Sequence, residues 1–131
     1  MSTVDDRLKS LGIELPPASA PGGNYVPCVE AKGLLFVSGQ VPMGPDGAAF
    51  IGRCGAEYGV EEGQEAARLC ALNILAQAKA ALGDLDRVKR VAKVNGYVAS
   101  TPEFRDQPKV INGASDLMAE VFGEAGRHAR A

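Results

Sequence analysis

The longest helical pattern in the chain, residues 60–83, constrains the fold more than any other segment. Glu61 and Glu62 lie in its first turn, where the helix dipole favours carboxylates, and Gly83 can cap its end. Six residues, five of them small, fall on one face: Ala67, Cys70, Ala71, Ile74, Ala78 and Ala81. We therefore expect this helix to lie close against a sheet that includes the next predicted strand, residues 88–98.

Four strands are predicted from apolar runs bounded by glycine and proline: residues 24–30, 33–40, 48–53 and 88–98. The LLFV run in the second strand indicates burial on both faces. A second helix is predicted over residues 108–122, with this apolar stripe: Ile111, Ala114, Met118, Val121 and Phe122. This order predicts an α+β fold, a mixed β-sheet covered on one face by two α-helices.

The 131 residues are expected to form a single domain, residues 1–131. Residues 1–23 are predicted to be a short helix capped by Thr3 and an extended lead-in rich in proline and glycine. A strand should follow the second helix, but residues 124–131 are too few and too charged to provide it. We therefore expect C-terminal strands to be missing from this chain, which would leave an unpaired sheet edge.

Composition narrows the function classes. A net charge of -2 gives no general attraction to polyanions, so a nucleic-acid partner is not expected. No apolar run reaches the length of a membrane span, and the polar N-terminus does not resemble a signal peptide. Three widely spaced cysteines, Cys28, Cys54 and Cys70, indicate free thiols in a reducing cytoplasm. With one histidine and no CxxC or HxxH spacing, no metal site is predicted.

Several motifs occur in a specific order. They are Tyr25-Val26, FVSGQVP at 36–42, ALGDLDRV at 81–88, Tyr97-Val98, Asn112 and Ala129-Arg130. Together they resemble the YjgF/RidA family of reactive enamine/imine deaminases, formerly the endoribonuclease L-PSP family, from about residue 24 onward. The chain is most similar to a branch with an extra N-terminal helix, and His128 stands where other members have proline.

The resemblance implies a chorismate-mutase-like fold and a homotrimer with sites in the clefts between subunits. It also implies hydrolysis of 2-aminoacrylate and related 2-imino acids to 2-keto acids and ammonia, without a cofactor. In the family two more strands follow the arginine, and one carries a glutamate linked to the attacking water. Two alternatives stay open: a non-catalytic trimer that binds small carboxylate metabolites, and, less favoured, an endoribonuclease.

The resemblance also implies the site residues. Arg130 is the predicted catalytic residue, because a planar guanidinium can hold a substrate carboxylate with two hydrogen bonds. Tyr25 is expected to cover the pocket from a neighbouring subunit. The Gly39 backbone and Asn112 are expected to orient the nitrogen end of the substrate.

Each of these residues also has a plainer interpretation. Arg130 near a chain end is often solvated, Tyr25 can be an edge-strand aromatic residue, and Gly39 can mark a strand kink. Asn112 can satisfy free backbone amides in the first turn of its helix. His128 can act as a general base, but a lone histidine between arginines is more often a surface residue, and that interpretation is favoured.

Overall fold

The computed structural model describes residues 2–131. The helices are α1 (Thr3–Ser10), α2 (Val60–Leu82) and α3 (Gln107–Phe122), with 3-10 helices η1 (Leu85–Arg87) and η2 (Gly123–Gly126). The strands are β1 (Cys28–Ala31), β2 (Leu34–Val37), β3 (Met43–Gly44), β4 (Gly47–Ala48), β5 (Lys93–Val94) and β6 (Ala129–Arg130). The two long helices therefore confirm the sequence prediction to within one residue at each end. Within the described residues, no helix is both long and apolar enough to cross a membrane.

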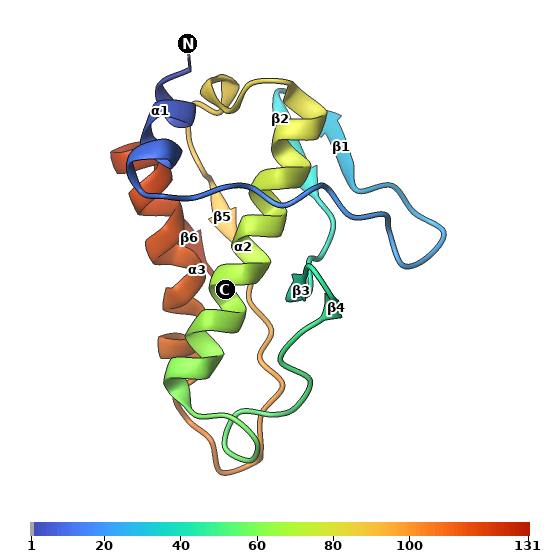
Figure 1. Cartoon of the computed structure of the whole chain (residues 1–131), viewed down its shortest axis with the longest axis vertical. Helices are drawn as coiled ribbons and strands as arrows, with labels where there is room; N and C mark the ends of the chain where they lie inside the picture. The colour runs from blue at the N-terminus through green and yellow to red at the C-terminus, as the bar shows by residue number, and fades with distance from the viewer. Residues whose placement is uncertain (1) are drawn as a thin grey trace.

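The centre of the molecule is the contact between α2 and α3, which lie side by side (Figure 1). A Cβ atom built on Gly113 would collide with the carbonyl oxygen of Gln64, so only glycine permits this approach. Ala67 and Ala71 on α2 and Ala114 on α3 are buried beside it. The largest fully buried side chains surround this contact: Leu75, Leu85, Leu117 and Val121.

The buried surface of α2 is wider than the six-residue stripe predicted. Ala67, Ala71 and Ala78 are buried as expected, but Ala81 is exposed. The reason is that α2 contacts α3 on one side and β1, β2 and β3 on the other (Figure 1). The second side buries two amides that the apolar pattern could not reveal, because they bind backbone carbonyls of segments distant in sequence. Asn73 Nδ2 donates to the Met43 carbonyl at 3.1 Å, and Gln77 Nε2 donates to the Ser19 carbonyl at 2.7 Å.

The predicted single mixed sheet is wrong in one respect. Within residues 2–131 the strands form three separate two-stranded ladders, β1-β2, β3-β4 and β5-β6, and only the last is parallel. Of the predicted strand 88–98, only β5 forms. The cross-strand backbone hydrogen bonds of this segment are limited to residues 91–96, which bond to residues 125–131. The expectation that no strand follows the second helix is also wrong, since β6 pairs with β5 through Val94 and Arg130.

The hairpin β1-β2 has one face that nothing within residues 2–131 covers. Cross-strand pairing places Val29 opposite Phe36, and Ala31 opposite Leu34, on the face turned away from α2. All four are exposed, Phe36 to 57%, whereas Leu35 packs against the core. The predicted burial of LLFV on both faces is therefore not found within one chain. We call Val29, Ala31, Leu34 and Phe36 the outer apolar face.

The N-terminal helix is fixed by its own cap and by a distant carboxylate. Ser2, rather than the predicted Thr3, is the N-cap, and its hydroxyl accepts from the Asp5 amide at 3.2 Å. The Asp86 carboxylate accepts from the amides of Thr3 at 2.7 Å and Val4 at 2.9 Å. Hydrogen bonds from Val4 and then Thr3 lower the pKa of Asp86 from its ordinary value.

This contact predicts a specific acid sensitivity. Because the folded pKa of Asp86 is depressed, its stabilising contribution is full above about 3.8, the ordinary value, and is lost as the pH falls through the folded pKa. The free energy of unfolding by denaturant should therefore differ between wild type and Asp86→Asn at neutral pH, and the difference should shrink in acid. Asp46→Asn, in the exposed β3-β4 turn, is the matched control. Parallel pH profiles for wild type and Asp86→Asn would contradict the assignment.

Candidate functional site

The C-terminal strand and α3 bring two of the predicted site residues together. Arg130 Nη1 donates to Asn112 Oδ1 at 2.7 Å and to Ser115 Oγ at 3.2 Å. Arg130 Nη2 donates to the Pro108 carbonyl at 2.8 Å. All three acceptors lie on one side of α3, because positions three and four apart share a helix face. We call Arg130 and Asn112 the first half-site.

The guanidinium of Arg130 keeps free donors while it is held. It has five N–H groups, and α3 takes both on Nη1 and one on Nη2. The Nε–H and one Nη2–H find no acceptor within residues 2–131, and Arg130 is exposed. Nε and Nη2 lie on the same edge of the guanidinium, which matches the spacing of two carboxylate oxygens. The first half-site is therefore able to bind a carboxylate from solvent.

A serine and a histidine extend this cluster. Ser115 Oγ lies 2.9 Å from His128 Nε2, and His128 Nδ1 lies 2.6 Å from the Gly126 carbonyl oxygen. A carbonyl only accepts, so Nδ1 carries the proton and Nε2 of the neutral ring accepts from the Ser115 hydroxyl. His128 is half-buried and both of its ring nitrogens have hydrogen-bond partners, so it is not a freely solvated side chain.

Sequence reasoning missed Ser115 altogether. A signal was present, because Ser115 follows Asn112 by three residues in a predicted helix, and His128 precedes Arg130 by two in an extended segment. Both spacings place side chains on a common side.

The other two predicted residues form a second group. The β1-β2 ladder continues past β2, since the Ser38 amide donates to the Pro27 carbonyl at 2.9 Å and Ser38 Oγ to the Val26 carbonyl at 2.7 Å. Tyr25 and Gly39 therefore flank the same end of the hairpin, and both are exposed. We call Tyr25 and Gly39 the second half-site. The β1-β2 hairpin whose end carries it lies across α2 from α3 (Figure 1), and no hydrogen bond within residues 2–131 joins Tyr25 or Gly39 to the first half-site.

The cysteines do not offer a nucleophile. Cys28, Cys54 and Cys70 are free thiols. Burial raises the pKa of Cys70 to about 11, and burial is also the largest cause of the raised pKa values of Cys28 and Cys54. Each thiol is therefore held in its unreactive neutral form. Within residues 2–131, no group of three or more His, Cys, Asp or Glu side chains is arranged to hold a metal ion.

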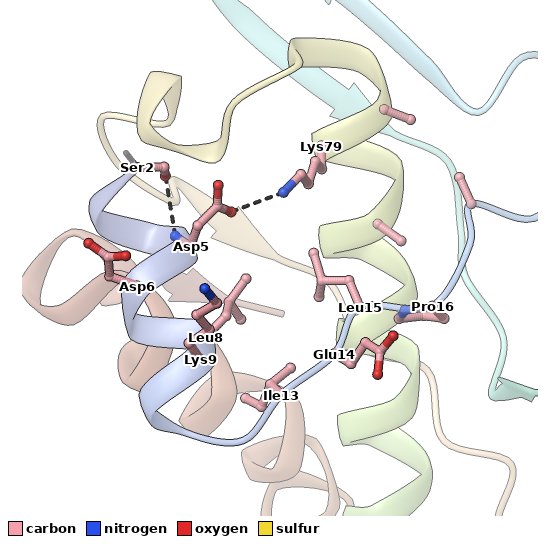
Figure 2. Close-up of a pocket in the computed structure, with 13 residues that line it drawn as sticks. Ser2, Asp5, Asp6, Leu8, Lys9, Ile13, Glu14, Leu15, Pro16 and Lys79 are labelled. Carbon is pink, nitrogen blue, oxygen red and sulfur yellow. Dashed lines mark hydrogen bonds and ion pairs between the residues drawn. The ribbon is translucent and has the colours of Figure 1, made fainter.

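A groove lies away from both half-sites. It has a volume of about 710 Å³ and is lined by α1, residues 13–18 and the second half of α2 (Figure 2). Its polar wall carries the Asp5–Lys79 ion pair at 3.0 Å, and Leu8, Ile13 and Leu15 supply apolar wall. Partly exposed ion pairs of this kind contribute little to stability. None of the predicted site residues lines this groove.

Residues 5–131 match the family model described as "YjgF/chorismate_mutase-like, putative endoribonuclease". The chain belongs to this YjgF family. The family assignment confirms the resemblance and the α+β, chorismate-mutase-like fold.

Two solved structures and one relative are similar over almost the whole chain. Protein Atu1372 of Agrobacterium tumefaciens, "with unknown function", is 54% identical with a TM-score of 0.88, over 98% of this chain and 79% of that chain. A "putative endoribonuclease" from Shewanella oneidensis is 42% identical with a TM-score of 0.95, over 98% of this chain and 85% of that chain. Protein TCP17 of Trypanosoma cruzi is 56% identical over 128 residues, 97% of this chain and 80% of its own length.

Proposed function

We propose that this YjgF family member hydrolyses reactive 2-enamino and 2-imino acids, such as 2-aminoacrylate, to 2-keto acids and ammonia. The proposal depends on the geometry of Arg130. Three hydrogen bonds hold its guanidinium on α3, and two N–H donors remain for a substrate carboxylate. Every 2-imino acid presents a carboxylate beside its C=N bond. Binding that carboxylate therefore fixes the reacting carbon relative to the protein.

The remaining site residues supply groups for the nitrogen end. Because Asn112 Oδ1 accepts from Arg130, its Nδ2 hydrogens are left to donate to the imine nitrogen. The Gly39 carbonyl can accept from the N–H, and Tyr25 can cover the pocket. An enamino acid reacts as its imine tautomer, formed when a proton moves from nitrogen to the terminal carbon. Water adds across the C=N bond, its hydroxyl to carbon and its proton to nitrogen. The new hydroxyl then gives its proton to nitrogen as the C=O bond forms and the C–N bond breaks. The products are a 2-keto acid and ammonia, so atoms balance with water as the only co-substrate.

We propose further that the protein is a homotrimer whose sites lie between subunits. Two features support this proposal. The outer apolar face leaves Val29, Leu34 and Phe36 more than half exposed, and such contiguous apolar patches are typical of protein interfaces. The β1-β2 hairpin and α3 also lie on different sides of α2 (Figure 1), which supports a site in which a second copy brings Tyr25 to Arg130.

The test is an assay in which a serine or threonine dehydratase generates the imino acid in place. Keto-acid release should be faster with the protein present than with the dehydratase alone, and heat-denatured protein is the control. If the rate of keto-acid release stays the same across a wide range of protein concentrations, the proposed activity is contradicted.

A non-catalytic function is the first alternative. Arg130 is exposed, and its free donors can bind a carboxylate without any attack by water, so binding does not require catalysis. A thermal-shift screen with 2-keto acids, giving stabilisation together with no turnover in the coupled assay, would favour a carboxylate-binding trimer.

Ribonuclease activity is the other alternative, because the family and the Shewanella protein carry that description. The net charge of -2 opposes binding to RNA. RNA cleavage that persists through further purification and disappears in Arg130→Ala would support it.

A further inference from the structure

We propose that Ser115 and His128 are positioning residues for Arg130, and that together they set how tightly the first half-site binds a carboxylate. This inference rests on the proposed carboxylate binding at Arg130. It adds two residues that do not touch the substrate but fix the residue that does.

The chain of hydrogen bonds begins at the backbone carbonyl of Gly126. Gly126 is buried, and a Cβ atom on it would collide with the Met118 carbonyl oxygen, so the backbone lies directly against α3. Its carbonyl accepts from His128 Nδ1 at 2.6 Å. The imidazole ring is therefore oriented by main chain that packs directly against α3.

The histidine then orients the serine. A serine inside a helix commonly turns its hydroxyl to a carbonyl of the preceding turn. Ser115 Oγ instead lies 2.9 Å from His128 Nε2, which accepts a hydrogen bond from the hydroxyl. The oxygen lone pairs are thereby turned to Arg130 Nη1, at 3.2 Å.

Nη1 donates to Asn112 and Ser115, and the third acceptor, the Pro108 carbonyl on Nη2, completes the three points that fix the plane of the guanidinium. The Nε–H and one Nη2–H have no acceptor within residues 2–131, so they are available before any ligand arrives. A preorganised fork binds more tightly because less side-chain freedom is lost on binding. The proposed reaction uses water as its nucleophile, and the Ser115 oxygen accepts a hydrogen bond from the cationic Arg130.

The test measures binding of 2-ketobutyrate by calorimetry, so it does not depend on turnover. Ser115→Ala and His128→Ala should each weaken binding by about tenfold, the usual worth of one charge-assisted hydrogen bond. Ser115→Thr keeps the hydroxyl and should bind within about twofold of wild type. The Ser115→Ala/His128→Ala double variant should be no weaker than either single variant, because both act through one chain of bonds.

The outcomes separate two failures. If wild type binds 2-ketobutyrate, Arg130→Ala does not, and Ser115→Ala binds normally, only the positioning inference is overturned. If the effects of Ser115→Ala and His128→Ala simply add, or Ser115→Thr is as weak as Ser115→Ala, the inference is also overturned. If wild type binds no 2-keto acid at all, both the positioning inference and the proposed function fail.

Discussion

Arg130→Ala is expected to lower kcat/KM for imino-acid hydrolysis by about two to three orders of magnitude, because two charge-assisted hydrogen bonds to the carboxylate are lost. The assay is keto-acid release coupled to a dehydratase. Arg130→Lys should fall in between, since an ammonium keeps the charge but not the two-pronged fork.

The matched control for this variant is Arg127→Ala. Arg127 is also exposed and lies three residues upstream, outside the hydrogen bonds of the first half-site. It should keep nearly full activity. Both alanine variants should unfold at temperatures close to wild type, because both side chains lie at the surface. Full activity in Arg130→Ala would contradict the assignment of Arg130 to the site.

Phe36→Asp is expected to convert the proposed trimer to a monomer and to abolish the proposed activity. In one chain Phe36 is 57% exposed and faces Val29 across the hairpin, so an aspartate costs the isolated subunit little. In the proposed interface the same carboxylate would be buried without a partner, at a cost of several kcal/mol. Monomers would have only separated half-sites and therefore no complete pocket.

Light scattering during size-exclusion chromatography checks this result. Wild type should have about three times the chain mass of 13.6 kDa, and Phe36→Asp should have the mass of one chain. Leu11→Asp is the control, because Leu11 is 42% exposed but ends α1, outside the outer apolar face. It should remain trimeric and active. A Phe36→Asp protein that stays assembled and active would show that the outer apolar face is not the interface.

The helices were predictable from the sequence, and the sheet was not. A helix is set by local spacing, so the pattern over residues 60–83 and the stripe from Ile111 to Phe122 correspond to α2 and α3. Strand pairing joins distant segments, and nothing local to Lys93 indicates that it pairs with Ala129. The same holds for Asn73 and Gln77, whose burial depends on backbone carbonyls far away in the chain.

The site was predictable in part. Family resemblance drew attention to Arg130 and Asn112, and their contact at 2.7 Å shows that the two lie together in one chain. The link from Ser115 to His128 could not be read from either residue alone, because it depends on η2 turning the chain back onto α3. The meeting of Tyr25 with Arg130 involves a second copy, so it remains a prediction.

Mixed trimers test the shared site most directly. Arg130→Ala and Tyr25→Ala proteins should each be nearly inactive alone. Refolded together in equal amounts, they should regain about one quarter of wild-type activity, because random assortment places an intact Arg130 against an intact Tyr25 at that fraction of interfaces. A mixture no more active than its two components would contradict a site built between subunits.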